Sequence, residues 1–278
     1  MPYKIVHKEV LGPVTKLMEV EAPLIAGKAK AGQFIILRID EHGERIPLTL
    51  ADWDAEKGTI TLVFQEVGKS STQLGTLEPG NEIQDLVGPL GKPTEIENYG
   101  TVVMVAGGLG IAPIYPIARE LKKAGNKIIT IMGARTGNLL FWEDRFEKLS
   151  DEFKLCTDDG CRGIKGVVTI PLKDILENAR PGLVFAIGPA IMMKFVARTT
   201  EPYGVKTMVS LNAIMVDGTG MCGACRCEVG GETRFSCVDG PEFDGHKVDF
   251  DLLMKRLGTY LEEEKEAMEL YTAHTTAK

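Results

Sequence analysis

The chain reads Ala106-Gly107-Gly108-Leu109-Gly110-Ile111-Ala112-Pro113 where a charge-free apolar run, Thr101–Ala106, gives way to the start of a helix. A glycine turn between a strand and a helix is typical of a nucleotide-binding βαβ unit, because the N–H groups at the helix start can bind a pyrophosphate. Taken alone, the turn is equally typical of a tight connection without a ligand. The segments on either side of it therefore decide the fold.

Strand-like and helix-like segments alternate from this turn onward. The expected strands are Thr101–Ala106, Lys127–Met132, Phe153–Thr157, Leu183–Ile187 and Lys206–Leu211. The expected helices are Pro113–Ala124, Phe141–Leu149, Ile170–Ala179 and Ile191–Glu201. Repeated strand–helix units build a doubly wound parallel sheet, so we expect an α/β domain over residues 98–211.

Two further glycine turns end expected strands of this domain. Ile187-Gly188-Pro189 closes the fourth strand, and Gly133-Ala134-Arg135 closes the second. The carboxyl ends of parallel strands meet at one edge of a sheet, and ligands of such sheets bind there. Three glycine turns at one edge therefore predict a dinucleotide site.

The residues before this domain show a different pattern, in which short β-rich runs alternate with turn residues. The runs are Tyr3–Val10, Lys16–Glu21, Gln33–Ile39, Ile46–Ala51, Thr59–Glu66 and Glu82–Val87. Closely spaced runs without helical periodicity indicate an antiparallel β-barrel. We therefore expect an all-β barrel domain over residues 1–97.

A cysteine-rich loop follows the last expected strand. Cys222, Cys225 and Cys237 occupy the second, third and fourth positions of the plant-type 2Fe-2S spacing C-x4-C-x2-C followed by a distant Cys, and Asp217 occupies the first. The glycines between them allow the backbone to curl and to point N–H groups at the sulfur atoms. The loop therefore predicts an iron-sulfur cluster with these four residues as ligands.

Other interpretations of the loop remain open. Cys222, Cys225, Cys227 and Cys237 together could hold a structural zinc ion, although zinc knuckles usually pair two C-x2-C turns and this chain has one. Cys227 is an alternative to Asp217 as the fourth cluster ligand, or else a small apolar side chain in a strand that leaves the loop. Asp217 could also be an ordinary turn residue.

Composition and charge narrow the function further. The 278 residues are 44% apolar, which fits two domains, and the net charge of -7 disfavours nucleic acid as a partner. The polar start predicts no signal peptide, and cysteines kept for a metal fit the cytoplasm. The charge-free stretch Thr101–Ala118 contains glycines and prolines, so we expect no membrane span. We predict no catalytic side chain, because no recognisable set is formed by His7, His42, His246 and His274.

A charged segment closes the chain. Leu252–Tyr271 places Leu253, Leu257, Tyr260 and Leu261 at helical spacing. This pattern predicts one solvated helix docked by a single apolar stripe. Together with the cysteine loop it makes up a third segment, residues 212–278.

Four motifs resemble the ferredoxin-NADP reductase superfamily over nearly the whole chain. Gly107–Pro113 is similar to its nicotinamide motif, and Gly188-Pro189-Ala190-Ile191-Met192-Met193 to its second one. Arg45-Ile46-Pro47-Leu48-Thr49 is similar to its flavin motif, and Gly68-Lys69-Ser70-Ser71-Thr72 to the stretch that holds the flavin pyrophosphate. The resemblance implies that the barrel binds FAD and that the α/β domain binds NAD(H).

The motifs assign residues to each cofactor. The resemblance implies flavin contacts from Arg45, Pro47, Leu48, Thr49, Gly68, Ser70, Ser71 and Thr72. Nicotinamide-dinucleotide contacts are expected from Gly107, Gly108, Gly110, Pro113, Arg135, Asp158, Gly188, Pro189 and Met192. Arg135 is a single cation near the expected adenosine ribose, and a 2'-phosphate normally needs more, so we expect a preference for NADH over NADPH.

Within the superfamily, a cluster loop after the nicotinamide domain resembles the electron-transfer subunits of dihydroorotate dehydrogenase and their relatives. Residues 157–169 and 216–223 are most similar to small subunits of NADH-dependent ferredoxin:NADP oxidoreductases, also called sulfide dehydrogenases, which carry Asp where the dihydroorotate relatives carry Cys. This resemblance implies a larger flavin and iron-sulfur partner subunit, through which electrons reach ferredoxin. Alternatives are a dihydroorotate or sulfide dehydrogenase subunit, a non-catalytic redox-sensing subunit and a zinc-stabilised binding module.

Overall fold

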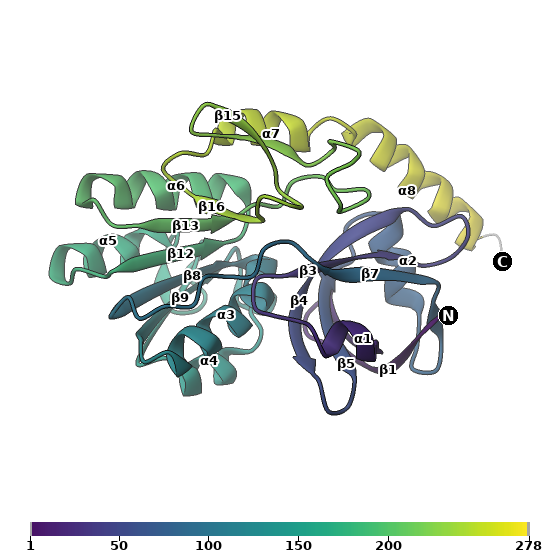
Figure 1. Ribbon diagram of the computed structural model, residues 1–278, viewed down its shortest axis with the longest axis horizontal. Helices are drawn as coiled ribbons and strands as arrows, with labels where there is room; N and C mark the ends of the chain where they lie inside the picture. Colours follow the sequence, from purple (N-terminus) through teal and green to yellow (C-terminus); the bar gives the residue numbers. More distant parts are fainter. Residues whose placement is uncertain (1, 277–278) are drawn as a thin grey trace.

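A computed structural model describes residues 2–276 and shows two seven-stranded sheets side by side. In Figure 1 the antiparallel sheet lies on the right and the mostly parallel sheet on the left, with the cysteine-bearing segment and the last two helices across the top. The predicted fold class, a β-barrel followed by an α/β domain and a cysteine loop, is confirmed. In the described part of the chain, no helix has the length and apolar character needed to cross a membrane.

The barrel contains every β-rich run expected from the sequence. Its strands follow the order β6-β1-β2-β5-β4-β3-β7, and every pairing is antiparallel. The last expected run divides into two short strands because Gln84 interrupts it. The bounds are β1 Tyr3–Val10, β2 Thr15–Glu21, β3 Phe34–Arg38, β4 Arg45–Asp54, β5 Thr59–Gln65, β6 Glu82–Ile83 and β7 Asp85–Leu90, with helices α1 Pro23–Ala26 and α2 Lys69–Thr76.

The second sheet has the order β11-β10-β9-β8-β12-β13-β16. Helices α3 and α4 cover one face, and α5 and α6 cover the other (Figure 1). Its strands are β8 Thr101–Gly107, β9 Lys127–Ala134, β10 Glu152–Thr157, β11 Ile164–Lys165, β12 Leu183–Ile187, β13 Thr207–Ser210 and β16 Glu242–Asp244. Its helices are α3 Ile111–Lys123, α4 Glu143–Leu149, α5 Thr169–Asn178 and α6 Ala190–Thr200, with short 3₁₀ turns at Gly108–Gly110, Gly137–Leu139 and Glu201–Tyr203.

Side-chain alternation along β8 explains why both faces of this sheet are covered. Val102 and Met104 pack in the core under α3 and α4, whereas Val103 and Val105 pack in the core under α5 and α6. Successive residues of a strand point to opposite faces, so a strand that is apolar throughout must be buried on both sides. The charge-free run in the sequence is therefore a central strand.

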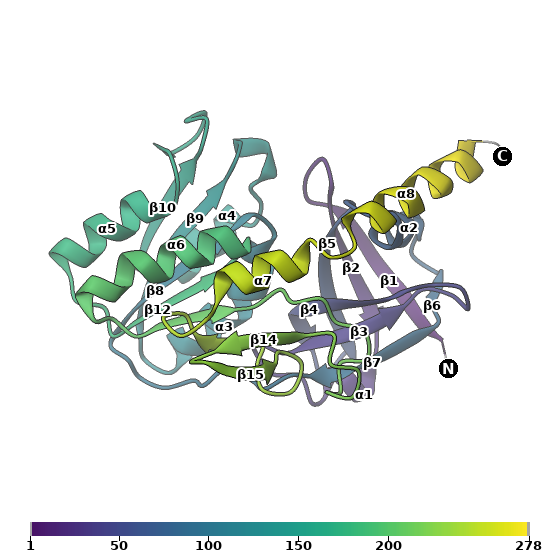
Figure 2. The same cartoon turned by 90° about the horizontal axis from the view of Figure 1, so that it is seen from above.

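The C-terminal tail differs from the prediction of one helix. The structure has two, α7 Phe250–Leu257 and α8 Leu261–Thr276, separated by Gly258–Tyr260. Leu253 is buried, but Leu261 is 61% exposed, so the expected single apolar stripe was wrong. Gly258 ends α7 because glycine is a poor helix former and leaves the backbone free to turn. Seen from above, α8 runs on to the barrel and lies beside α2 (Figure 2).

The cysteine-bearing segment is joined to the α/β sheet. It contains a hairpin, β14 Arg226–Val229 and β15 Glu232–Phe235, and then β16, which pairs antiparallel with β13 at the edge of the sheet. Ser210 and Glu242 are partners in this pairing. The division of the chain at residues 97/98 and 211/212 stays a prediction.

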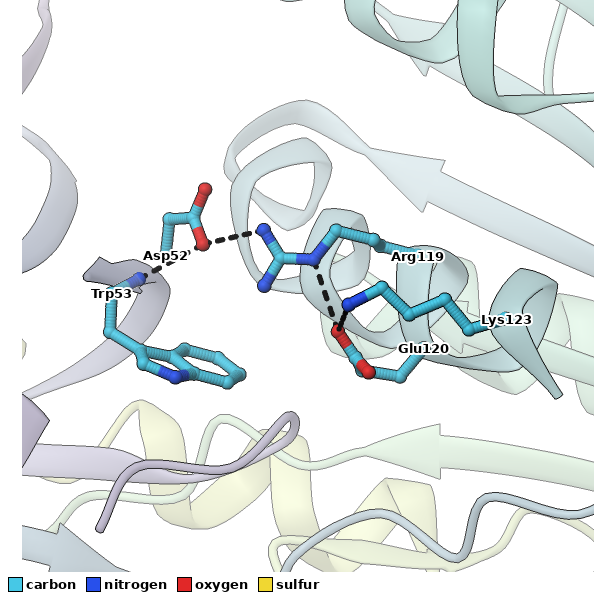
Figure 3. Close-up of polar contacts among 5 residues, drawn as sticks. All are labelled: Asp52, Trp53, Arg119, Glu120 and Lys123. Carbon is cyan, nitrogen blue, oxygen red and sulfur yellow. Dashed lines mark hydrogen bonds and ion pairs between the residues drawn. The ribbon is translucent and has the colours of Figure 1, made fainter. Parts of the chain in front are cut away.

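The barrel and the α/β domain meet where α3 lies against β4. Arg119 on α3 donates from Nη1 to Asp52 Oδ1 on β4 at 2.7 Å, and its guanidinium carbon stands 5.4 Å from the Trp53 ring centroid (Figure 3). Glu120 accepts from both Arg119 and Lys123. These polar contacts flank a shared apolar core, so the two domains are held in one arrangement.

Candidate dinucleotide and metal sites

The two predicted nicotinamide motifs pack directly against each other. Strands β8 and β12 are neighbours, with Ala106 opposite Ile187, so the turns that follow them lie side by side. A Cβ on Gly110 would overlap the carbonyl oxygen of Ile187, and a Cβ on Gly107 would overlap the Sδ of Met192. The backbone contact at Gly110 leaves no room for a side chain, and the two turns therefore form one rigid edge.

Gly108 is different from its neighbours because it faces open space. Its φ is +54°, a left-handed conformation that favours glycine, and an added Cβ would meet no atom within 4 Å. Helix α3 begins immediately after this turn, at Ile111, two residues earlier than the sequence predicted. An open glycine turn that leads into a helix fits a dinucleotide phosphate, which needs close backbone approach.

The turns after β9 and β10 complete this edge of the sheet. The N–H of Asp158 donates to Ala134 O at 3.1 Å, which places the exposed Asp158 next to the exposed Arg135. Sequence reasoning missed Cys161, whose Sγ accepts the N–H of Gly137 at 3.1 Å and so ties the two turns together. The predicted residues at the carboxyl ends of β8, β9, β10 and β12 are therefore brought to one edge.

The predicted flavin motif lies on β4, which is paired with β3. Pro47 stands opposite Ile36, and Thr49 stands opposite Phe34. Because side chains alternate along a strand, Arg45, Pro47 and Thr49 share one face of β4. Leu48 points the other way and packs against the barrel core. The structure thus separates Leu48 from Arg45, Pro47 and Thr49.

The predicted pyrophosphate stretch forms the start of α2. The first intrahelical bond runs from Thr72 N to Gly68 O at 2.9 Å, so the preceding N–H groups have no acceptor within the helix. Ser71 Oγ accepts from the N–H of Gly68 at 3.1 Å and thereby shapes the turn, while Ser70 Oγ donates to Glu44 Oε2 at 2.5 Å. A Cβ on Gly68 would meet nothing within 4 Å. This open start with free donors fits a flavin pyrophosphate.

Asp217 organises the first half of the cysteine loop. Its Oδ1 accepts the N–H of Thr219 at 2.8 Å, and its Oδ2 accepts the N–H of Cys222 at 2.9 Å. The bond from Thr219 is the main cause of a lowered pKa of the Asp217 carboxyl, which therefore stays ionised. The loop takes left-handed φ values of +74° at Gly218 and +84° at Gly220, as the curled-loop prediction requires.

Cys225 and Cys237 form the second half. Their Sγ atoms stand 3.1 Å apart in a buried position. Burial and the neighbouring Cys225 raise the pKa of Cys237 to about 12, so a metal that binds this pair must displace protons.

The two halves adjoin but do not form a compact metal site. Within residues 2–276, no three His, Cys, Asp or Glu side chains are already grouped closely enough to hold a metal ion. Cys222 is exposed at the tip of the loop, whereas Cys225 and Cys237 are buried. Three thiols and one ionised carboxylate, in a glycine-rich loop, fit an iron-sulfur cluster in their chemistry.

Cys227 lies in β14, outside the loop. Its thiol donates to Arg234 O at 3.6 Å and accepts from Ser236 Oγ at 3.4 Å, and it belongs to the core beneath α7. Burial raises the pKa of its thiol. These contacts match the expectation of a small side chain in the strand that leaves the loop.

The cysteine loop packs onto the strand pair that carries the flavin motif. A Cβ on Gly218 would stand 2.6 Å from Leu90 Cδ1 and 2.9 Å from Ile36 Cγ1. Ile36 is the strand partner of Pro47, and Phe34 and Ile36 share a core with Cys225 and Cys237. The candidate metal site and the candidate flavin site are therefore neighbours, which the sequence did not reveal.

Sequence reasoning also missed Glu242, which links three parts of the chain. Its Oε1 accepts from Thr94 Oγ1 at 2.6 Å, and a Cβ on Gly32 would overlap both atoms. Glu242 thus sits between the barrel, the interdomain connection and the cysteine-bearing segment. Burial raises the pKa of this carboxyl to about 7. No motif could have identified it, because the signal lies in its packing.

Comparisons with known proteins match both halves of this arrangement. Residues 104–198 match the family model of the oxidoreductase NAD-binding domain, and residues 212–249 match that of the iron-sulfur cluster binding domain of dihydroorotate dehydrogenase B. The matched segments contain the glycine turns and the cysteine loop.

Relatives and a solved structure match 70% to 98% of the chain. A Thermotoga maritima homologue of the electron transfer subunit of dihydroorotate dehydrogenase B is 50% identical over 91% of this chain and 89% of its own length. A probable subunit of this kind from Methanocaldococcus jannaschii is 40% identical over 70% of this chain and 72% of its own. A chain in a solved NADH-dependent reduced ferredoxin-NADP oxidoreductase, studied for flavin-based electron bifurcation, superposes with a TM-score of 0.93 at 46% identity over 98% of both chains.

Proposed function

The chain belongs to the family of dihydroorotate dehydrogenase B electron transfer subunits and their homologues, and from this premise we propose a specific role for it. It is the small subunit of an NADH-dependent ferredoxin:NADP oxidoreductase. In this role it passes electrons between NAD(H), an FAD on the barrel and a 2Fe-2S cluster in the cysteine loop, and on to a larger partner subunit.

The proposed cofactor sequence follows from how electrons move. A nicotinamide gives up two electrons as a hydride and an iron-sulfur cluster accepts one at a time, so bound FAD supplies the conversion between the two. Pro47 and Thr49 would hold the flavin ring on the outer face of β4, and the start of α2 would hold its pyrophosphate. The glycine turns at Gly107–Gly110 and Gly188 would hold the dinucleotide.

One observation carries the proposal, namely the contact between the cysteine loop and β3. Gly218 packs on Ile36, which stands opposite Pro47 in the sheet. The cysteine loop and the flavin motif thus lie beside each other on the same face of the β3–β4 strand pair. This proximity supports electron transfer from the barrel to the cysteine loop.

The surroundings of the loop support a protein partner. Exposed apolar side chains flank the cysteines at Val216, Met221 and Val238, and Met221 is 88% exposed. Apolar side chains gathered at the rim of a candidate metal site are typical of an interface through which electrons leave a subunit. A larger flavin and iron-sulfur subunit, with ferredoxin beyond it, fits this surface.

An anaerobic titration of the purified chain with NADH tests the electron path. We expect the visible absorbance of FAD to bleach and the signal of a reduced 2Fe-2S cluster to appear in the electron paramagnetic resonance spectrum. A colourless protein that contains zinc and no flavin would contradict the proposal. A coloured protein whose cofactors NADH leaves oxidised would support the redox-sensing alternative instead.

The same assay tests nucleotide preference. Arg135 is the exposed cation at the expected ribose end, and Asp158 lies beside it through the bond from Asp158 N to Ala134 O. A carboxylate there favours a free ribose hydroxyl and repels a 2'-phosphate. We expect NADH to reduce the flavin far faster than NADPH, and equal rates at equal concentrations would contradict this assignment.

A second candidate is the electron transfer subunit of dihydroorotate dehydrogenase B itself, which the match over residues 212–249 favours. The two candidates differ in the larger subunit. Purification of the native complex decides between them, since only one partner would carry further iron-sulfur clusters and reduce ferredoxin. A native complex with only copies of this chain that still reduced ferredoxin would exclude both.

A further inference from the structure

An open groove lies between the start of α2 and the last helix. It has a volume of about 710 Å³, within the range of about 300–1,000 Å³ typical of small-molecule sites. Its barrel side is formed by Val67 and Gly68. Its other wall is one face of α8, with Leu261, Glu264, Lys265, Met268, Glu269, Thr272 and Ala273.

The spacing of the α8 residues shows that the groove follows the helix for most of its length. They recur at intervals of three and four, which places them on one face. Met268 is half-buried, whereas Leu270 lies outside the groove and is 56% exposed. Helix α8 therefore directs a defined face toward the start of α2.

Charge divides the groove into two parts. The α8 wall carries the carboxylates of Glu264 and Glu269 and the ammonium group of Lys265, which stands 3.8 Å from Glu269. This wall is too acidic to hold a pyrophosphate, whereas the start of α2 offers N–H donors. An uncharged group with a flat apolar surface suits the wall around Leu261 and Met268.

We propose that α8 forms the adenosine subsite of FAD. With the pyrophosphate at the start of α2, the adenosine extends along the groove and the adenine lies against Met268 and Leu261. The inference rests on the proposed function, because it requires FAD on the barrel. It assigns a role in cofactor selection to a helix outside both family-model matches.

Flavin affinity measured on the full chain tests this inference. Flavin-free protein is titrated with FAD and with FMN, which lacks the adenosine, and binding is followed by quenching of flavin fluorescence. Met268→Glu places a charge in the groove, so we expect the Kd for FAD to rise about tenfold while the Kd for FMN stays unchanged. Leu270→Glu is the matched control on the opposite face and should change neither value.

A second variant strengthens the test. Lys265→Gln removes the ammonium group from this wall and leaves the carboxylates of Glu264 and Glu269, so we expect a smaller loss, about threefold, again for FAD alone. Unchanged FAD affinity in Met268→Glu would overturn the inference. This holds also if the variant loses a copurifying partner protein but keeps its FAD affinity. Equal losses for FAD and FMN with a lower melting temperature would also overturn it, since α8 would then merely stabilise the barrel. Wild-type protein that binds neither flavin would instead refute the proposed function.

Discussion

The glycine edge of the α/β domain and the cysteine loop are both built from glycine-rich turns, yet they differ in how complete they are. At the glycine edge, Gly110 packs so closely against the backbone of Ile187 at the end of β12 that a methyl group has no room. In the cysteine loop, Cys225 and Cys237 already touch while Cys222 stays exposed. The fold alone forms the first site, whereas the second is assembled in halves that a metal can join.

The largest effect should come from breaking the glycine edge. Gly110→Ala forces a Cβ onto the carbonyl oxygen of Ile187, a backbone atom that cannot move aside. We expect a loss of at least ~4 kcal/mol in the free energy of unfolding, enough to prevent folding of the α/β domain. Gly68→Ala is the control, because its φ of -138° suits any residue and its Cβ meets open space. Urea unfolding of both variants measures the difference, and equal midpoints would show that this edge can yield.

The cysteine loop should respond to mutation in its iron content and keep its fold. Asp217→Ala removes the proposed fourth ligand and the acceptor for the N–H groups of Thr219 and Cys222, so most of the iron should be lost while FAD stays bound. Asp217→Cys should keep the cluster and shift its reduction potential, since thiolate is a softer ligand than carboxylate. Cys227→Ala should change little. Iron analysis that shows the reverse pattern, with Cys227→Ala stripped and Asp217→Ala intact, would identify Cys227 as the fourth ligand.

Glu242 provides a pH-dependent test of the junction between the barrel and the cysteine-bearing segment. Burial raises its pKa from 4.5 to about 7 in the folded chain, so the folded state holds a proton that the unfolded state releases between these values. The contribution of Glu242 to the free energy of unfolding is greatest below pH 4.5 and is lost as the pH rises through 7. The total change is about 3 kcal/mol. Glu242→Gln should remove this dependence in urea unfolding at pH 5 and pH 8. Glu95→Gln should reduce it only slightly, because burial is a larger cause of the raised pKa than the charge of the exposed Glu95.

The smallest effect is expected at the contact between α3 and β4. Arg119→Ala removes the ion pair with Asp52 and the contact with the Trp53 ring, both partly exposed to solvent. We expect a loss of about 1 kcal/mol in the free energy of unfolding and a slower reduction of the flavin by NADH. Lys123→Ala, whose side chain is mostly exposed, is the control. Unchanged flavin reduction in Arg119→Ala would show that the apolar core alone sets the domain arrangement.

Local patterns in the sequence predicted the barrel strands, the glycine turns and the α/β strands β8, β9, β10, β12 and β13, because each depends on neighbouring residues. The short strands β11, β14, β15 and β16 were not predicted. Three further features were not predicted. Leu48 points into the barrel, because the core of the barrel covers that face of β4. The tail breaks at Gly258, and only the contact of α8 with α2 shows where the second helix goes. Glu242 acquires its environment from Thr94, far away in the chain.

Because Ser210 pairs with Glu242, the cysteine-bearing segment is an insertion between two paired strands, β13 and β16. The segment between these two residues leaves the sheet and returns to it at neighbouring positions. The pairing of β13 with β16 therefore already offsets the entropy cost of closing this long loop, and iron binding does not have to offset it. A chain that loses its iron should consequently remain folded and accept new iron. The paired strands β13 and β16 also mark a place where one redox loop can be exchanged for another without disturbing the barrel or the α/β domain.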